Sequence, residues 1–324
     1  MSATIDDSGR RQLAVVCDGG IRYLTSLDGI DWDETPFVPA IDRIETEPRI
    51  AVDGETVYVA YSLLAPMDGG CGDDGLDDLG VYIRSRRGLD GAWSDPVRVG
   101  RAGDRVQAFR AVDGVFHLTV TADDGSSMFY ESVWSGGSTR MAIPDAVSTS
   151  LRVGDDGHAR IAFATDHAIK YARVDDDQLL IETVAQDSAT YLTSPSLVLG
   201  AGDRASIIWT QSVDSGGGCA GPDPGPHDGT YVATENGTGW NVERITRLQG
   251  QTSITLDPST GGVEVVLAER GLIHFSSTID GWSSETIPGS EGIGSPVVRR
   301  DPVTGALVVF GINYETGVLS LTKS

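Results

Sequence analysis

The chain repeats an apolar, strand-like run about every 44 residues, and this period constrains its fold more than any other feature. The runs are centred on Val15, Val59, Leu118, Ala162, Ile207, Val265 and Val308. Two of the gaps are longer by roughly 15 residues, and each of these holds one insertion, so the period is preserved. Repeated units of this size bury their apolar faces by stacking on their neighbours.

Each unit contains four short strands in the same order. The unit at 194–247 shows them as PSLVL, ASIIWT, TYVATEN and WNVERIT, separated by turns rich in Gly and Asp. A tryptophan follows the third turn in four units, at Trp32, Trp93, Trp240 and Trp282. Four antiparallel strands per repeat are typical of propeller blades. The sequence therefore predicts an all-β fold, a seven-bladed β-propeller of four-stranded antiparallel blades with an incomplete last blade.

The predicted propeller is one domain covering residues 1–324. Its blades are expected at about 1–40, 46–100, 105–144, 147–186, 194–247, 251–288 and 294–324. The last unit stops after its third strand. It is either a three-stranded blade, or completed by the segment at Met1, or completed by another chain, since an open sheet edge accepts a strand. A β-sandwich, the rival architecture, does not explain the preserved period.

The chain is strongly acidic, with 47 Asp and Glu against 24 Lys and Arg and a net charge of -23. Such a surface repels nucleic acid and anionic membranes, so neither is an expected partner. Lys170 and Lys323 are the only lysines. This bias is similar to that of proteins from haloarchaea and other salt-adapted organisms, although codon bias alone also produces it.

The N-terminal segment MSATIDDSGRR has no secretory signal pattern, and no apolar stretch is long enough to span a bilayer. We expect no membrane insertion. An extracellular or virion location is predicted, and a cytoplasmic one stays open. The expected partners are other protein subunits of a larger assembly, or a surface glycan or receptor.

The two long insertions, SLLAPMDGGCGDDGLDDLG and TQSVDSGGGCAGPDPGPHDG, both connect the second strand of their unit to the third. Such connections leave a propeller on one face, so both are expected at one mouth of its channel. Each carries one cysteine, Cys71 and Cys219, and loops of this length can reach each other. The sequence predicts a Cys71–Cys219 disulfide; the alternatives are two free thiols or crosslinks to another subunit.

The same insertions concentrate carboxylates, which we take as candidate binding residues at this mouth. The candidates are Asp68, Asp73, Asp74, Asp77, Asp78, Asp214, Asp223, His227 and Asp228. Oxygen ligands on glycine-rich turns suit Ca²⁺, but the spacing matches no known calcium loop. Solvated carboxylates are the default in so acidic a chain, so no cofactor is predicted and Ca²⁺ remains an alternative.

The segment Ser26-Leu-Asp28-Gly29-Ile-Asp31-Trp32 resembles the Asp-box of sialidase-like (BNR-repeat) propellers, S-x-D-x-G-x-x-W, shortened by one residue. Weaker copies stand at 280–282, 90–93 and 237–240. The resemblance extends over the repeat along the whole chain. In that superfamily the motif is structural and occurs in enzymes, lectins and structural propellers alike, so it implies a fold and no single function.

Sialidases use an arginine cluster, a tyrosine and glutamate pair and an acid/base aspartate. The arginines to which the resemblance points are on first strands, where they are expected to line the channel: Arg49, Arg110, Arg152 and Arg299. The family's first arginine lies in an R-I-P element, whereas here Pro48 precedes Arg49. An arginine in the channel of an acidic protein also serves to neutralise charge, which is the interpretation we favour.

No nucleophile elbow, zinc motif or phosphate-binding loop is present in the sequence. We therefore predict a non-catalytic binding or structural propeller, a recognition, adhesion or assembly module of an extracellular or virion particle. The alternatives are a sialidase-like glycoside hydrolase and a glycan-binding lectin with sites between blades.

Overall fold

The computed structural model describes residues 1–17, 20–37, 44–64, 80–88, 90–175, 178–213, 225–313 and 317–323. It divides into two compact units, Met1–Asp145 and Ala146–Ser324, which are described separately below. Apart from one 3₁₀ turn (Ala201–Asp203), the regular structure in these described ranges is β-strand.

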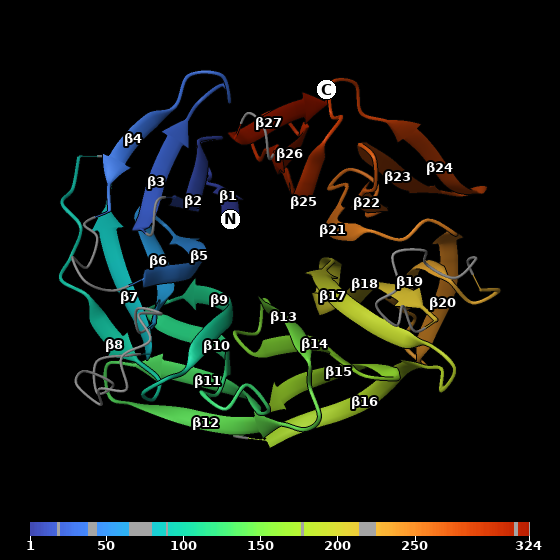
Figure 1. Cartoon of the computed structure of the whole chain (residues 1–324), viewed down its shortest axis with the longest axis horizontal. Coiled ribbons are helices and arrows are strands. Elements are labelled where there is room, and N and C mark those ends of the chain that lie inside the picture. Colours follow the sequence, from blue (N-terminus) through green and yellow to red (C-terminus); the bar gives the residue numbers. More distant parts are fainter. Residues whose placement is uncertain are drawn as a thin grey trace, which may run out of the picture. The chain divides into compact units, whose positions relative to one another are not determined.

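The first unit contains three four-stranded sheets (Figure 1). Their strands are β1 (Ser2–Ile5), β2 (Arg11–Cys17), β3 (Gly20–Ser26) and β4 (Asp33–Pro36); β5 (Ile44–Asp53), β6 (Thr56–Leu64), β7 (Gly80–Arg87) and β8 (Val97–Val99); and β9 (Arg105–Val112), β10 (Val115–Thr121), β11 (Met128–Trp134) and β12 (Gly137–Ile143). We number these sheets first, second and third.

The second unit contains three four-stranded sheets and one three-stranded sheet, numbered fourth to seventh (Figure 1). Their strands are β13 (Ser148–Val153), β14 (Ala159–Thr165), β15 (Ala168–Asp175) and β16 (Gln178–Gln186); β17 (Tyr191–Leu199), β18 (Ala205–Ser212), β19 (Gly229–Glu235) and β20 (Trp240–Thr246); β21 (Gln251–Leu256), β22 (Val263–Ala268), β23 (Leu272–Thr278) and β24 (Gly281–Thr286); and β25 (Ile293–Arg300), β26 (Leu307–Asn313) and β27 (Gly317–Lys323).

Every sheet is an antiparallel meander in which strands adjacent in the chain are hydrogen-bonded neighbours. The prediction of an all-β protein with four-stranded antiparallel blades is confirmed. Six blades have four strands, and the seventh sheet has three. The second strand of a sheet is buried on both faces: six of the seven residues of β14 are buried, and all six of β22 are. Outer strands such as β24 are mostly exposed.

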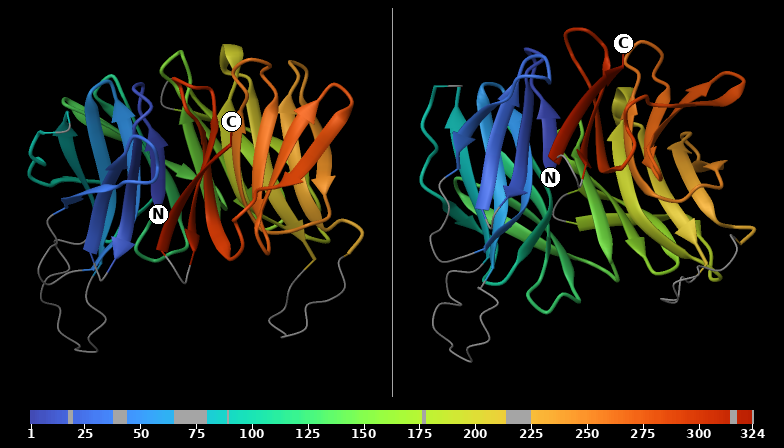
Figure 2. Two further views of the ribbon diagram at one scale, coloured as in Figure 1. Left: turned by 90° about the horizontal axis from the view of Figure 1, so that it is seen from above. Right: turned by 45° about the horizontal axis from the view of Figure 1, so that its top comes forward.

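Within each unit, consecutive sheets pack face to face through apolar side chains. Between the fourth and fifth sheets, Ala162 and Tyr171 meet Ile207 and Trp209, all of them buried. The strands of neighbouring sheets run side by side in both views of Figure 2 within each unit. Burying a large apolar side chain contributes roughly 1.5–3 kcal/mol, so these contacts between sheets supply most of the stability.

A serine hydroxyl joins the first strands of consecutive sheets at three equivalent positions. The backbone N–H of Ile50 donates to Ser2 Oγ over 3.1 Å. The N–H of Leu197 donates to Ser150 Oγ, and that of Val298 to Ser253 Oγ, each over 3.0 Å. These first strands belong to different sheets and do not pair with each other, so the side chain supplies the acceptor that a buried N–H requires.

Three first strands carry the same bulge, each containing a proline. The pairing register slips between Thr46 and Arg49, between Thr193 and Ser196, and between Gly294 and Val297. Each slip leaves a buried proline, Pro48, Pro195 or Pro296, at the position before the pairing resumes. Proline lacks an N–H to donate to the ladder, so a bulge suits it.

The Asp-box-like turn forms the hydrogen bonds that its residues predict. Asp28 Oδ1 accepts the N–H groups of Ile30 and Asp31 over 2.8 and 3.0 Å, and Ser26 Oγ accepts the N–H of Gly29 over 2.7 Å. The bonds from Ile30 and Asp31, together with one that the Ser26 hydroxyl donates over 3.0 Å, lower the pKa of the Asp28 carboxyl. Gly29 has a φ of 80°, which glycine adopts without a Cβ clash.

Two of the repeated tryptophans, Trp93 and Trp240, pack on the preceding sheet. Trp93 meets Tyr23 of the first sheet and Phe37, which follows β4, edge-on, with centroid distances of 5.1 and 5.0 Å. Trp240 of the fifth sheet meets Tyr171 of the fourth in the same way, at 5.3 Å. Edge-to-face geometry is favourable for aromatic rings, so the repeat position serves to join sheets.

The third sheet contains a buried ion network. Arg140 contacts Asp104 through two bonds of 2.6 and 3.0 Å and Glu131 through one of 3.3 Å, and its guanidinium lies 4.1 Å from the centre of the Phe129 ring. Burial raises the pKa of Glu131 even though Arg140 opposes the shift. One cation thus compensates two carboxylates.

Replacing Ser253 by alanine should lower the free energy of unfolding by about 1–2 kcal/mol, because the buried N–H of Val298 loses its acceptor. Urea titration followed by tryptophan fluorescence measures this. Ser283→Ala, at an exposed position of β24, is the control and should change the value by less than about 0.5 kcal/mol. Equal effects of the two variants would contradict the assigned role.

Replacing Arg140 by alanine should lower the free energy of unfolding by about 3–5 kcal/mol, because two buried carboxylates lose the cation that bonds both of them. The pKa of Glu131 is already raised, so the loss should be larger at neutral pH than in mild acid, where protonation relieves the repulsion. Denaturant midpoints at several pH values test this. An Arg140→Ala variant whose stability loss is independent of pH would show that the carboxylates are not the cause.

Candidate functional site

Most of the residues predicted to bind at the channel mouth lie outside the described residues. These are Asp68, Asp73, Asp74, Asp77, Asp78, Asp214 and Asp223, together with Cys71 and Cys219. The disulfide and the binding role of these aspartates therefore stay predictions. His227 and Asp228 are described.

Asp228 holds backbone in place. Its carboxylate is buried and accepts the N–H of Val213 over 2.7 Å and the N–H of Gly225 over 2.8 Å. Both carboxylate oxygens are thereby used within the chain. The structure gives Asp228 a structural position rather than one open to a ligand.

His227 lies beside it but is exposed. Its Nδ1 is 3.2 Å from Asp187 Oδ2, which also accepts from Gln211 Nε2 over 2.8 Å. The His227 side chain retains 61% of its accessible surface. It is therefore free to contact a partner, as the sequence predicts, and that role remains to be tested.

The four predicted channel arginines all lie on first strands, and their conformations are alike. In each, Nη1 donates to the carbonyl oxygen of the preceding residue, over 3.2 Å to Pro48, 2.7 Å to Phe109, 2.9 Å to Leu151 and 2.8 Å to Val298. Pairing registers show that Arg110, Arg152 and Arg299 follow the buried residue at the centre of their strand, whereas Arg49 precedes it.

Arg49 belongs to one of the proline bulges, which explains why its proline is on the side opposite to that of the sialidase element. Its Nε donates to the carbonyl oxygen of Gln107 over 2.5 Å. Burial lowers the pKa of Arg299 to about 10, although its side chain keeps partial solvent access. The four arginines are divided between the two units, so the channel-lining role expected for them stays a prediction.

The structure shows a different candidate site, a groove of about 730 Å³ between the fourth and fifth sheets. Here the apolar core between the two sheets ends. Along one face of the fourth sheet, the row Ala162–Tyr171–Glu182 is followed by the row Arg160–Arg173–Leu180, each joined by strand pairing. The charged groove defined by these rows is continuous with the core that contains Tyr171.

Arg160 forms the floor of the charged groove. It is 5% exposed, and its Nη2 lies 2.5 Å from Asp156 and 3.6 Å from Asp203. Its Nη1 is buried and has no hydrogen-bond partner among the described residues. Burial opposes ionisation of Asp156, but the bonds from the His158 N–H and Arg160 outweigh it and lower the pKa of this carboxyl.

Asp203 connects the turns of the two sheets. It follows β17 in the 3₁₀ turn, where its φ is 60°, and it accepts the N–H of Asp155 over 2.8 Å. A Cβ at Gly154 would lie 2.5 Å from the carboxylate of Asp203, so glycine permits this approach. An aspartate tolerates positive φ better than most residues, and its bonds fix the wall of the groove.

Tyr171 presents the central polar group of the charged groove. The residue is 6% exposed and lines the cavity, but its hydroxyl forms no hydrogen bond within the described part of the chain. Burial raises its pKa to about 12, so the hydroxyl remains protonated and can both donate and accept. A hydroxyl that borders a cavity and has no partner among the described residues is left for water or a ligand to complete.

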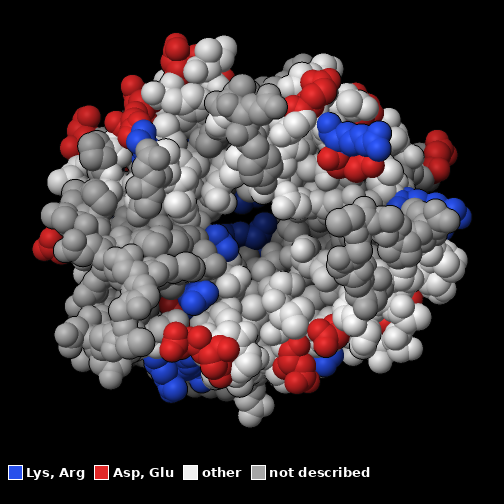
Figure 3. Space-filling view, in the orientation of Figure 1, with Lys and Arg blue, Asp and Glu red and all other residues white. Residues whose placement is uncertain are grey.

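The remaining walls carry groups of both signs. Arg173 is exposed and forms no ion pair with any described residue. Glu182 lies across the strand pair from Tyr171, and Glu235, at the end of β19, accepts the N–H of Ala205 over 3.2 Å. Leu180, 44% exposed on the outer strand β16, adds an apolar edge. Mixed charge also marks the face drawn in Figure 3, where carboxylates and arginines are interspersed.

A second groove, of about 370 Å³, lies between the fifth and sixth sheets and is lined by Arg204, Leu199 and Leu256. The turn Ala201–Asp203 separates it from the charged groove. Arg204, like Arg173, is an exposed arginine without an ion pair among the residues that the structure describes.

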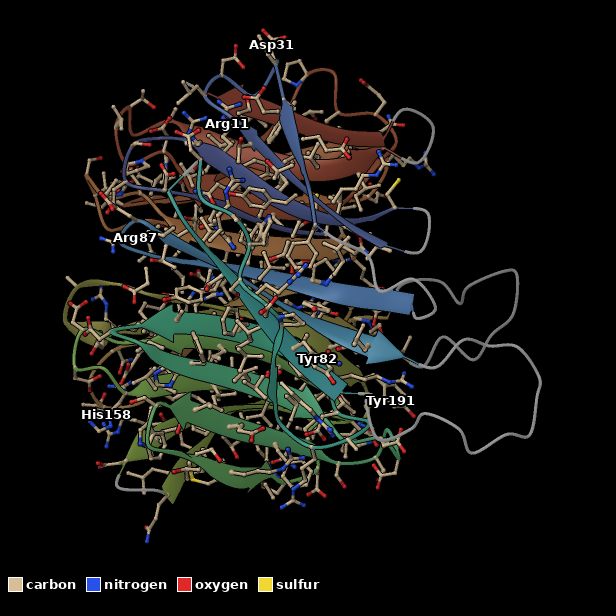
Figure 4. The ribbon with its side chains drawn as sticks, turned by 90° about the vertical axis from the view of Figure 1, so that its left-hand side faces the viewer. Arg11, Asp31, Tyr82, Arg87, His158 and Tyr191 are labelled. Atoms are coloured by element: carbon tan, nitrogen blue, oxygen red, sulfur yellow. The ribbon has the colours of Figure 1, made fainter. Side chains whose placement is uncertain are left out.

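Both grooves lie at the end of the strands opposite to the one where β18 ends at Ser212. His158, in the turn between β13 and β14, and Tyr191, at the start of β17, appear at opposite ends of the strands in Figure 4. Tyr191 pairs with Ser212 at the end of β18, from which the chain leaves toward His227. The charged groove is at the His158 end.

The sequence analysis did not predict this groove, because the residues that line it come from two different repeats. Arg160 is the one signal available: a charged residue near the start of the otherwise apolar strand ARIAFAT. Its partner Asp203 belongs to the next unit and sits in a turn where aspartate is already expected.

No three His, Cys, Asp or Glu residues are grouped to hold a metal ion in the described ranges. No helix there is long and apolar enough to cross a bilayer.

No family model and no curated protein sequence matches the chain. Solved structures do. An ulvan lyase of a polysaccharide lyase family, solved bound to -[GlcA(1-4)Rha3S]-, matches with a TM-score of 0.65 and 12% identity over 99% of this chain and 92% of its own. The hydrazine synthase of Kuenenia stuttgartiensis gives 0.67 and 10% over 100% and 95%. A WD40 β-propeller domain gives 0.61 and 14% over 100% and 92%.

At these identities the likeness shows the fold alone. The chain is a β-propeller. Because the similar structures include both lyases and WD40 domains, they do not single out the sialidase-like propellers. That resemblance stays a prediction.

Replacing Asp228 by alanine should lower the free energy of unfolding by about 1–3 kcal/mol, because two backbone N–H groups lose a charged acceptor. The adjacent His227→Ala is the matched control and should cost less than about 0.5 kcal/mol, since His227 is exposed. Chemical denaturation measures both. If His227→Ala were as destabilising as Asp228→Ala, the structural role of Asp228 would be wrong.

Proposed function

We propose that this protein is a non-catalytic binding propeller and that the charged groove between the fourth and fifth sheets is its recognition site. The observation that carries the proposal is the Tyr171 hydroxyl, which belongs to a residue only 6% exposed, borders the cavity and forms no hydrogen bond with any described residue. A polar group in this state is completed by what binds beside it.

The protonation states in the charged groove support binding rather than acid–base chemistry. Burial keeps Tyr171 protonated, with a pKa of about 12, while hydrogen bonds keep Asp156 ionised by lowering its pKa. A general acid or base works best when its pKa is near the working pH. These two groups instead keep one state, as hydrogen-bonding groups of a recognition site do.

Several finer proposals accompany this one. We count the three-stranded sheet β25–β27 as a seventh blade, and we take the acidic surface as an adaptation to salt. The partners would be protein subunits or a surface glycan, met outside the cell or on a virion. The Cys71–Cys219 disulfide would then be compatible with the location. The acidic composition and the exposed His227 support this picture.

The sialidase-like alternative would place the chemistry on Arg49, Arg110, Arg152 and Arg299. Each of them already donates a hydrogen bond to the preceding carbonyl. This shared bond favours the interpretation that they neutralise charge and brace the first strands.

The test is a combined array of oligosaccharides and peptides, probed with the wild-type protein and with the Tyr171→Phe/Arg173→Gln double variant. We expect at least one ligand to bind the wild type but not the double variant. After incubation with the wild type, the mass of this ligand should be unchanged. Arg204→Gln, outside the charged groove, should bind as the wild type does. Cleavage of the ligand, or equal binding by the wild type and the double variant, would contradict the proposal.

A further inference from the structure

The charged groove surrounds one hydroxyl with groups of both signs. Tyr171 lies within electrostatic range of two arginines, Arg160 and Arg173, and of two glutamates, Glu182 and Glu235. A carboxylate or phosphate placed at this hydroxyl would be attracted by the arginines but repelled by the glutamates. A cationic group would be repelled by the arginines and attracted by the glutamates. Asp156 and Asp203 add two further carboxylates to the lining and already hold Arg160, so the groove as a whole is acidic and an anionic ligand is disfavoured.

The same groups alternate as donors and acceptors. Arg173 offers N–H donors, Glu182 and Glu235 offer carboxylate acceptors, and the Tyr171 hydroxyl does both. A ligand that satisfies them all must itself both donate and accept at neighbouring atoms. Vicinal hydroxyl groups on a sugar ring have this property, because each one is a donor and an acceptor.

Peptide recognition fits the charged groove less well. Peptides are held by added strand hydrogen bonds with apolar pockets for side chains, or by apolar grooves. Here the floor is Arg160, held by Asp156 and Asp203, and the apolar part is confined to the edge at Leu179, Leu180 and Ile181 of β16. A sugar ring needs only one such edge for its C–H face.

The charged groove is built before any ligand arrives. Asp203 fixes the turn at Asp155, and its carboxylate and that of Asp156 hold the guanidinium of Arg160. Groups that are already ordered lose little entropy on binding, which favours measurable affinity for a weakly bound ligand class. The volume of about 730 Å³ falls in the range of small-ligand sites.

We infer that the charged groove binds an uncharged oligosaccharide, held through its ring hydroxyls by Tyr171, Arg173, Glu182 and Glu235. This inference rests on the proposed function and adds the chemical class of its ligand. It places recognition between two blades and away from the first-strand arginines.

The experiment is isothermal titration of the full chain with neutral gluco-, manno- and galacto-oligosaccharides, with uronic acid oligosaccharides of matched length, and with a lysine-rich peptide. We expect a neutral oligosaccharide to bind. Tyr171→Phe and Arg173→Gln should each weaken it about tenfold, the loss of one to two hydrogen bonds. Arg204→Gln, an equally exposed arginine in the second groove, should bind as the wild type does.

Salt dependence provides an independent measure. Attraction between charges falls as ionic strength rises, whereas hydrogen bonding to neutral hydroxyls does not. The affinity should therefore stay constant from low to high salt. Since Arg173 is exposed, its replacement leaves the fold intact even if Tyr171→Phe loosens it, and equal thermal midpoints confirm this.

The outcomes separate the two proposals. If the uronic acid oligosaccharides or the peptide bind in a manner lost with Arg173→Gln and the neutral sugars do not, the ligand class is wrong and the binding site stands. If neutral sugars bind equally well to the Tyr171→Phe and Arg173→Gln variants, the inferred contacts are wrong. If no ligand responds to either variant, the proposed function falls with the inference.

Discussion

The sheets of each unit bury their apolar faces against the neighbouring sheets of the same unit. The packing of one sheet on the next is thus the interaction on which the rest depends. Tyr171, Ile207 and Trp209 show it between the fourth and fifth sheets. The serine hydrogen bonds between first strands add further contacts between packed sheets. Two of the tryptophans that follow the third turns do the same. The charged groove occupies the place where that contact stops.

The period and the strand order were predictable because turns and apolar runs alternate visibly. The register within the runs was not. Pairing places Leu13, Ile161 and Val309 opposite the buried centres of their first strands, one or two residues away from the markers Val15, Ala162 and Val308. In runs such as RQLAVVC and ARIAFAT both faces are buried, so no polar alternation reveals which residue faces which side.

The candidate site was less predictable than the fold. Loop carboxylates look alike in a sequence whether they face solvent, a ligand or backbone N–H groups, and Asp228 proves to bind the N–H groups of Val213 and Gly225. Arg160 and Asp203 belong to neighbouring repeats, so no local spacing joins them. The repeat itself hides such pairs, because a period describes what the units share, whereas a site arises where two of them differ.

The two walls of the charged groove belong to different sheets: Tyr171 and Arg173 to the fourth, Asp203 and Glu235 to the fifth. A ligand held by both walls is a crosslink between consecutive blades. Its binding free energy then adds to the free energy of unfolding, since the separated sheets no longer form the site. Occupancy would make these two blades open together rather than one at a time, turning a chain of nearest-neighbour contacts into a larger cooperative unit.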